Sequence, residues 1–405
     1  MKVLVINADC VCTNSSANLC HLAYIKGLLQ AGHEVSLLSA SANGRLTDPT
    51  MHIPEEVTSY TYDGLSLYGR LSRAKQAKAG AVPTGQSMQR TAPSFRSKLI
   101  RKVKNGILAC YGIHGIYATF ARKARKFTSP EEYDYILSLS TPTVSHLLAY
   151  QLIKSGRVKG KQWIQIWEDP WYSDVYGGNH VEPVRREEKK LLSYAQKICY
   201  VSPLTLRNQQ KLFTESAHKM YWQPLPFYYK SDSVTAENRK SNLYGYFGDY
   251  VPESRNLAPF YEAAKECTVD VNICGNPCNL FASTERIHIH PRLTLDKLKP
   301  IEDHTNVLVF LCNRTGGQIP GKIYQYSATC KTVLFILDGT EEEKQVLSDF
   351  FSPLNRYVFC QNTKESISEA IRRIESGDLG GVNNIPLEVF DPKVTIQKIL
   401  DGGCK

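Results

Sequence analysis

A glycine-rich loop is the part of the sequence whose residue types and spacing most directly suggest chemistry. It runs Thr315-Gly-Gly-Gln-Ile-Pro-Gly-Lys-Ile-Tyr-Gln-Tyr326, between the apolar runs Val307–Leu311 and Thr332–Leu337, each of strand length. Glycines let a backbone approach a ligand closely, and N–H groups at a helix start favour an anion, as does the cation Lys322. Pro320 suits a first helical turn. The loop predicts a phosphate site in an α/β domain, or else a tight turn.

Strand and helix patterns alternate on both sides of a polar segment, Ser231–Ser241, which we interpret as a linker. This order predicts two Rossmann-like domains of parallel sheet facing a central cleft at the carboxyl ends of the strands. We expect an N-terminal domain at 1–230 with a basic insertion at 64–130, a C-terminal domain at 242–385, and a final helix within 386–405 that packs back on the first domain. The segment Ala42–Ser94 is rich in Gly, Ser, Thr and Pro and interrupts the alternation.

The expected strands are Lys2–Asn7, Glu34–Ser39, Tyr135–Leu139, Gln162–Trp167 and Lys197–Val201, then Tyr244–Gly248, Val269–Cys274, Ile287–His290, Val307–Leu311, Thr332–Leu337 and Tyr357–Cys360. The expected helices are Asn18–Gln30, Thr143–Ser155, Pro183–Ala195, Pro203–Phe213, Leu257–Glu266, Lys364–Ser376 and Pro392–Leu400. A further helix begins at a capping box made by Thr340 and Glu343.

Composition narrows the class of protein. The chain has 405 residues, 42% hydrophobic and 22% charged, as is typical of a folded protein with two domains. No apolar run is as long as a membrane span, and Met1–Asn7 lacks a secretory signal, so we predict a cytoplasmic protein.

The cysteines and histidines do not predict a metal site. Most of the twelve cysteines lie in apolar segments, where reduced thiols behave as small hydrophobic groups, for example Cys199, Cys274 and Cys312. Neither Cys10-Val-Cys12 nor Cys274-Gly-Asn-Pro-Cys278 has a second pair at zinc spacing. The sequence has no Asp-x-Asp pair, and we interpret His288 and His290 as strand residues.

The positive charge is concentrated in one region. Fourteen Lys and Arg residues, and no Asp or Glu, lie between Gly64 and Pro130, although the net charge of the whole chain is only +10. Within it, residues 97–127 interleave basic and apolar side chains at helical spacing, which predicts a surface for an anionic membrane. The alternatives are a solvated face or an apolar face packed on its own domain. No recognition motif accompanies the charge, so no nucleic acid is predicted.

Several motifs together carry a resemblance to a known family. They are Gly32-His33-Glu34-Val35, Trp163–Trp171, Ile198–Pro203, Tyr246-Phe-Gly-Asp-Tyr-Val-Pro-Glu-Ser-Arg-Asn256 and Gln318–Tyr326. In this order the chain resembles the GT-B glycosyltransferases, above all the bacterial retaining group called family 4, over most of its length except roughly 42–129. The resemblance implies a nucleotide-sugar donor, bound without a metal or another cofactor.

The resemblance also implies roles for individual residues. Arg255 and Lys322 would hold the diphosphate of the donor, and Asp169 would be the carboxylate near the reacting sugar. The full donor set is Gly248, Arg255, Gly317, Ile319, Gly321, Lys322 and Gln325, and the acceptor set is Asn14, Ser15, Asp169 and Trp171. Asp169 could instead cap a turn, and Asn14 and Ser15 could cap the next helix.

Two positions depart from the family pattern. Gln325 stands where the family usually has a glutamate bound to the ribose, and Gly317 stands where a second glutamate helps to position the sugar. An amide accepts a hydrogen bond less strongly than a carboxylate. These departures leave the donor sugar open and allow an inactive homologue.

The sequence therefore predicts a cytoplasmic glycosyltransferase, peripheral on the inner membrane face. It would move a sugar from a nucleotide-sugar to a glycan or a lipid-linked glycan in surface polysaccharide synthesis. The alternatives are a nucleotide-sugar 2-epimerase of the same fold and a non-catalytic scaffold. A nicotinamide dehydrogenase is not predicted, because Asp9-Cys-Val-Cys-Thr-Asn14 follows the first strand in place of a G-x-G-x-x-G turn.

Overall fold

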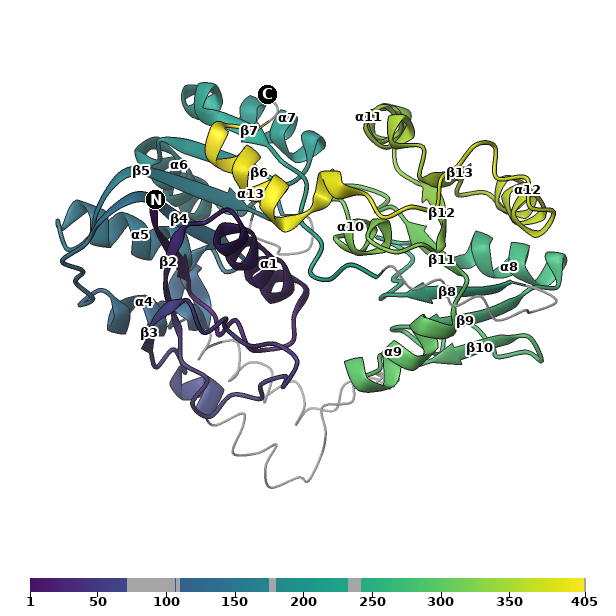
Figure 1. The fold of residues 1–405 in the computed structure, drawn as a ribbon, viewed down its shortest axis with the longest axis horizontal. Coiled ribbons are helices and arrows are strands. Elements are labelled where there is room, and N and C mark those ends of the chain that lie inside the picture. Colours follow the sequence, from purple (N-terminus) through teal and green to yellow (C-terminus); the bar gives the residue numbers. More distant parts are fainter. Residues whose placement is uncertain (71–105, 107–109, 175–179, 232–241, 404–405) are drawn as a thin grey trace. The chain divides into compact units, whose positions relative to one another are not determined.

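The chain forms two α/β units, each built on a parallel sheet (Figure 1). The computed structural model describes residues 1–70, 106, 110–174, 180–231 and 242–403. Among these, the first unit holds the residues up to 228 and from 389 onward, and the second unit holds 229–388. The fold class predicted from the alternating pattern, two Rossmann-like domains, is confirmed.

The first unit has a sheet of seven parallel strands in the order β3-β2-β1-β4-β5-β6-β7. The strands are β1 Lys2–Asn7, β2 Glu34–Ala40, β3 Thr58–Tyr62, β4 Glu132–Ser140, β5 Lys159–Trp167, β6 Lys197–Tyr200 and β7 Met220–Trp222. The α-helices whose bounds lie within the described residues are α1 Ser16–Gln30, α4 Ala118–Ala124, α5 Val144–Lys154, α6 Glu182–Tyr194, α7 Pro203–Leu212 and α13 Pro392–Asp401. Helix α13 packs on α1, where a Cβ on Gly27 would lie 2.2 Å from the carbonyl oxygen of Pro392.

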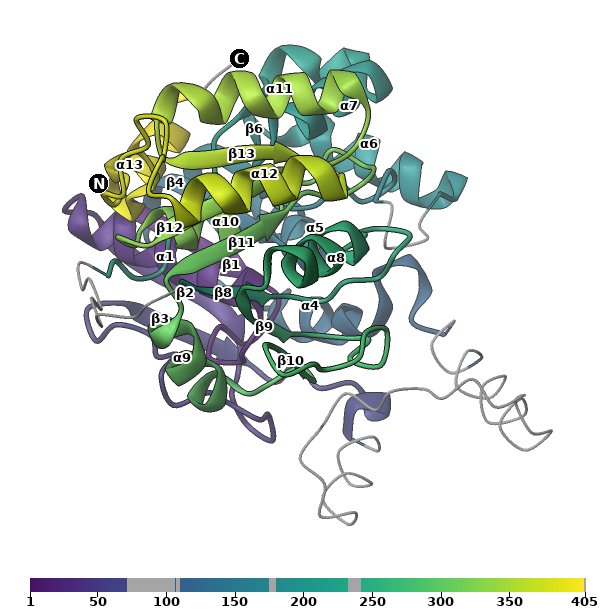
Figure 2. The ribbon, with the colours of Figure 1, turned by 90° about the vertical axis from the view of Figure 1, so that its right-hand side faces the viewer.

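The second unit has a sheet of six parallel strands in the order β10-β9-β8-β11-β12-β13 (Figure 2). The strands are β8 Leu243–Phe247, β9 Asp270–Cys274, β10 Ile287–His290, β11 Val307–Leu311, β12 Thr332–Leu337 and β13 Tyr357–Gln361. The α-helices are α8 Ala258–Cys267, α9 Leu295–His304, α10 Lys322–Ser327, α11 Glu341–Phe351 and α12 Lys364–Glu375. The predicted capping box of Thr340 and Glu343 opens α11. Helices α8 and α12 pack side by side over the sheet.

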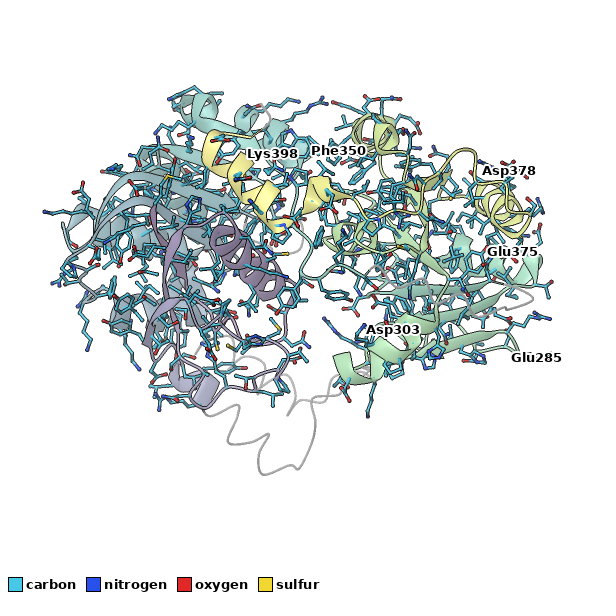
Figure 3. The ribbon with its side chains drawn as sticks, viewed as in Figure 1. Glu285, Asp303, Phe350, Glu375, Asp378 and Lys398 are labelled. Carbon is cyan, nitrogen blue, oxygen red and sulfur yellow. The ribbon has the colours of Figure 1, made fainter. Side chains whose placement is uncertain are left out.

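Strand patterns predict β11 and β12 well because these strands are buried on both faces. All five residues of β11 are buried, as a parallel strand covered by helices on both sides requires. At the amino end of β8, the hydroxyl of Tyr244 donates to the carboxylate of Glu375. Glu375 is the last residue of α12 (Figure 3). The core that includes β8, β9, β11 and α8 is continuous with that helix.

Three elements were not predicted from the sequence. Strand β3 lies in the segment that interrupts the alternation, and it is an edge strand of Thr, Ser and Tyr in which Tyr60 and Tyr62 are only partly buried. Strand β7 has only three residues. Helix α9 contains Pro300, which ordinarily argues against a helix interior. Short or mostly polar elements carry little periodicity, so tertiary contacts decide them.

Arg356 is a fully buried cation in the second unit. Its guanidinium donates to the carbonyl oxygens of Thr329, at 2.7 Å, and Lys331, at 2.6 Å, and to Oδ1 of Asn384 at 3.1 Å. None of the described carboxylates lies within 4 Å of it, and burial lowers its pKa. Arg356 thus ties the loop after α10 to strand β13 through neutral oxygens.

Cys199, Cys274 and Cys312 are buried free thiols, as expected. His288 and His290 are residues of strand β10, also as expected. Most of the basic stretch at 97–109, like the predicted linker from 232 to 241, lies outside the described residues.

Helix α4 is one of the described helical segments of the basic region. It buries Phe120, Ala121 and Ala124 and packs against α5 and β3. In this part of the basic region, an apolar helix face packs on its own domain, which is one of the two alternatives to a membrane surface. Within the described part of the chain, no helix is both long and apolar enough to cross a membrane.

Candidate functional site

The loops at the carboxyl edge of the second sheet are joined to one another through their backbones. After β8, the N–H of Gly248 donates to the carbonyl of Cys274 at 2.9 Å, and after β9, Gly275 donates to His290 at 3.1 Å. A Cβ on Gly275 would lie 1.9 Å from the carbonyl oxygen of Gly248, whereas a Cβ on Gly248 would find only ordinary contacts. The close approach therefore demands a glycine at 275, which sequence reasoning did not single out.

Arg255 follows the β8 loop and is held by neutral oxygens. Its Nε donates to Oδ1 of Asn313 at 2.7 Å, and its Nη1 lies 3.5 Å from the carbonyl oxygen of Asp249. No carboxylate among the described residues lies within 4 Å of the guanidinium. Burial raises the pKa of Tyr246 to about 12, although Arg255 opposes this rise. Among the described residues, Arg255 therefore has no acidic partner at ion-pair distance.

The nearby carboxylate of Asp249 faces other partners. Its Oδ2 lies 3.2 Å from Nη1 of Arg292, and its Oδ1 accepts from the N–H of Asn276 at 3.0 Å. Asp249 therefore fastens the loops after β9 and β10, and its negative charge is matched by Arg292.

The glycine-rich loop follows β11 and precedes α10, as predicted. Gly316 and Gly317 have φ values of 98° and 69°, which other residues rarely adopt, while Gly321 has an ordinary helical φ of −59°. Ile319 is buried. The expectation that Pro320 would lie in the first helical turn is wrong, because α10 begins two residues later and the Pro320 carbonyl accepts from Ile323.

Lys322 is the first residue of α10 and is exposed. Its Nζ lies 5.9 Å from the ring centroid of Phe247, the last residue of β8. Although the residue keeps accessible surface, protein atoms around its ammonium lower its pKa, with Glu302 opposing and the charge of Arg255 adding to the shift. No described carboxylate lies within 4 Å of the ammonium. The structure thus brings Lys322, Gly248 and Arg255 to one edge of the sheet.

Gln325 lies one turn further along α10 and binds the main chain. Its Nε2 donates to the carbonyl of Tyr229 at 2.7 Å, and its Oε1 accepts from the Tyr229 N–H at 3.4 Å. A carboxylate could accept but could not donate, so these two contacts suit an amide. The ribose contact predicted for Gln325 would compete with the Tyr229 backbone.

The carboxyl edge of the first sheet carries two adjacent acids. Asp169 follows β5, and its Oδ2 accepts from the hydroxyl of Thr141 at 3.4 Å. Glu168 lies 3.2 Å from Nε2 of His21, which is fully buried on α1. Burial raises the pKa of Glu168, and His21 opposes the rise. Burial and the charge of His21 lower the pKa of His146, which is also fully buried, to about 3.

The other predicted acceptor residues have structural partners. Ser15 caps α1 by accepting from the N–H of Asn18 at 3.1 Å, the alternative that the sequence left open. Asn14 donates to Oδ2 of Asp48 at 2.9 Å. Trp171 is buried, with its ring 5.2 Å from that of His114. Of the acceptor set, Asp169 is therefore the member whose side chain is charged and only partly buried.

Glu188 positions the backbone next to Asp169. It is fully buried on α6, and its Oε2 accepts from the N–H of Tyr172 at 2.6 Å, while Oε1 accepts from Trp171 at 3.4 Å. The sequence signal was a carboxylate on the apolar stripe of α6 with Val184, Leu191 and Leu192, which are buried.

Glu188 is expected to lower the stability of the protein as the pH rises. Burial raises its pKa to about 7 from an ordinary 4.5, so above 4.5 the folded state keeps a proton that the unfolded state has released. The free energy of unfolding then falls between about pH 4.5 and about pH 7. Glu188→Gln removes this titration, so the stability of the variant relative to the parent should rise by on the order of 3 kcal/mol between about pH 4 and above pH 7. This change is added to a cost that does not depend on pH, because the amide nitrogen cannot accept from one of the two backbone N–H groups.

Urea unfolding of both proteins between about pH 4 and about pH 8 checks this expectation. Glu187→Gln, one position away on the same helix, is the matched control for loss of a carboxylate outside the core. A stability difference for Glu188→Gln that does not change with pH would contradict the assignment.

Among the described residues, no group of three or more His, Cys, Asp or Glu side chains is arranged to hold a metal ion. Comparison with protein-family models gives no match, and no curated protein matches the sequence.

Solved structures share the fold. The catalytic domain of starch synthase IV from Arabidopsis thaliana, bound to ADP and acarbose, matches with a TM-score of 0.62 at 10% identity, over 99% of this chain and 97% of that chain. A sucrose-phosphate synthase from Thermosynechococcus elongatus matches with a TM-score of 0.53 at 12% identity, over 100% and 94%.

A putative UDP-N-acetylglucosamine 2-epimerase from Listeria monocytogenes matches with a TM-score of 0.50 at 11% identity, over 98% of this chain and 94% of that chain. At these identities the likeness shows the fold alone. The chain has the GT-B fold, with two Rossmann-like domains.

Proposed function

We propose that this protein is a glycosyltransferase that takes a sugar from a nucleotide-sugar donor. The observation that carries the proposal is the pair of cations at the carboxyl edge of the second sheet. Arg255 and Lys322 lie near each other, beside a glycine-rich loop, and none of the described carboxylates compensates either charge within 4 Å. Such a pair suits the negative charge that develops on a diphosphate leaving group.

The donor would bind through its diphosphate, without a metal ion. Gly248, Gly317, Ile319 and Gly321 would form the backbone around the phosphates, with Lys322 and Arg255 supplying the charge that a metal would otherwise supply. A starch synthase structure of the same fold is described as bound to ADP, which supports a nucleoside diphosphate as the ligand class.

The acceptor would be a glycan or a lipid-linked glycan, as in surface polysaccharide synthesis. Asp169 would be the carboxylate near the reacting sugar, oriented by Thr141. We assign the chain to the retaining family 4 on its sequence motifs. In such a transfer the leaving phosphate oxygen can take the proton of the acceptor, so no protein base is required.

Docking on an anionic membrane is a further part of this proposal. It rests on the charge of residues 97–127, which contain eight Lys or Arg and no Asp or Glu. A cytoplasmic enzyme held at the inner membrane face would reach a lipid-linked acceptor.

Two alternatives have specific support. The shared fold with a putative 2-epimerase favours an enzyme that eliminates and readds the nucleotide at one sugar. The contact of Gln325 with Tyr229 favours a homologue that has lost the ribose contact, and with it catalysis. Incubating the protein with a nucleotide-sugar alone distinguishes the first alternative, because only an epimerase changes the sugar without an acceptor.

A thermal-shift screen against UDP-, GDP-, ADP- and CMP-sugars, without added metal, tests the proposed function. A ligand that binds only the folded state raises the melting temperature, and ligand at about 100 times its Kd stabilises by about 2.7 kcal/mol. We expect a shift with one nucleotide class. No shift with any of them, confirmed by calorimetry, would overturn the nucleotide-sugar assignment.

A further inference from the structure

Asn313 lies between β11 and the glycine-rich loop, and it uses both ends of its amide. Its side chain is buried, with 8% of the residue exposed. Oδ1 accepts from Nε of Arg255 at 2.7 Å, and Nδ2 donates to the carbonyl of Gln318 at 2.9 Å. Since Nε can only donate and the carbonyl can only accept, the two partners determine which amide atom faces which side. One neutral side chain thereby links Arg255 to the glycine-rich loop.

The same two loops are also joined by contacts that do not involve this amide. The N–H of Arg314 donates to the carbonyl of Ser254 at 2.9 Å, and Nη1 of Arg314 donates to the carbonyl of Pro252 at 3.1 Å. A substitution at position 313 should therefore change the guanidinium of Arg255 more than it changes the register of the loops.

The neutrality of Asn313 matters for the charge of Arg255. A carboxylate at 2.7 Å from Nε would form an ion pair and would weaken the attraction of Arg255 for any other anion. Two acids are close in sequence. Asp249 turns its carboxylate to Arg292 and offers Arg255 only its main-chain oxygen, and the carboxylate of Glu253 forms no ion pair with Arg255 among the described contacts. The oxygens of Asn313 and of the Asp249 main chain that contact Arg255 are thus neutral.

We propose that Asn313 is a positioning residue for the diphosphate of the donor. Its amide orients the Arg255 guanidinium beside the glycine-rich loop and leaves the positive charge free for the phosphates. This role rests on the proposed function, and it assigns to Asn313 a task that an acid of the same shape could not perform.

Asn313→Asp is the sharpest test, because it keeps the shape and the acceptor for Arg255 while adding a negative charge. It also replaces the donor to the Gln318 carbonyl with an oxygen that cannot donate, and the contacts of Arg314 still join the two loops. The probes are inorganic pyrophosphate and the diphosphates UDP, GDP and ADP, with Kd measured by calorimetry. We expect Asn313→Asp to raise Kd about tenfold or more, the size of one charge-assisted contact. Asn306→Asp is the matched control, since its Oδ1 accepts from the Leu243 N–H at 3.1 Å at the opposite edge of the same sheet.

A double-mutant cycle with Arg255→Met shows whether Asn313 acts through Arg255. If it does, Asn313→Asp should change Kd less than about twofold once Arg255 is gone, because the two effects are coupled. An equal loss in both backgrounds, or an unchanged Kd for Asn313→Asp in the parent, would overturn the positioning role. Melting temperatures of the unliganded variants show that each is folded.

The same experiment separates this inference from the proposed function. If the parent binds neither pyrophosphate nor any of the three diphosphates, the phosphate site itself is wrong and both proposals fail. If the parent binds and Arg255→Met weakens binding while Asn313→Asp does not, the phosphate site stands and only the role of Asn313 is overturned.

Discussion

Lys322→Ala should weaken binding of the nucleotide-sugar by about tenfold to a hundredfold, the cost of one lost charge-assisted contact to phosphate. The stability of the unliganded protein should hardly change, because Lys322 is exposed and has no described acid within 4 Å. Its contact with the ring of Phe247 at 5.9 Å is worth at most about 1 kcal/mol at such a site. Calorimetry with the nucleotide-sugar found in the screen measures the loss.

Lys265→Ala is the matched control for this experiment. Lys265 also lies over an aromatic ring, with its Nζ 5.5 Å from the centroid of Tyr261, but it is in the last turn of α8, away from the carboxyl ends of the strands. The control should bind as the parent does. Equal affinity of parent and Lys322→Ala would remove Lys322 from the site and with it half of the observation on which the proposed function rests.

Arg356→Met should destabilise the second unit by about 3 kcal/mol or more. The substitution leaves the buried carbonyls of Thr329 and Lys331 without their donors, and each unpaired group costs about 1–3 kcal/mol. Removing the buried cation recovers part of its desolvation free energy, and the methionine side chain fills the vacated space with apolar atoms. We expect the unpaired carbonyls to outweigh this gain, because Arg356 has its acceptors in place.

Scanning calorimetry of the second unit's transition measures the effect. Arg372→Met is the control, because Arg372 is an exposed residue of α12 in an ion pair with Glu266, and such pairs contribute under about 1 kcal/mol. If Arg356→Met melts at the temperature of Arg372→Met, the buried contacts of Arg356 do not stabilise the fold.

The periodicity of the strands made most of the fold predictable. Strands β11 and β12 of the second sheet are apolar runs, because helices cover both faces, and their bounds could be read to within a residue or two. Strand β3 could not be read in this way, since it is an edge strand that depends on pairing with β2. The glycine-rich loop was predictable because Gly316 and Gly317 need φ values that other residues avoid.

The site was only partly predictable. Sequence motifs identified Arg255, Lys322 and Gln325, but they said nothing of what holds these side chains. Asn313 is 58 residues from Arg255, and Gln325 is 96 residues from Tyr229, so only the folded chain brings these pairs together.

The sequence by itself determined the two parallel sheets and the position of the glycine-rich loop, because local periodicity and glycine content encode them. The tertiary structure decided which charged and neutral groups surround the cations of the site. It turned the carboxylate of Asp249 to Arg292 and gave Arg255 the neutral oxygen of Asn313. Whether a cation is available to a ligand depends on which groups lie within a few ångströms of it, and that is a property of the fold rather than of any segment of the chain.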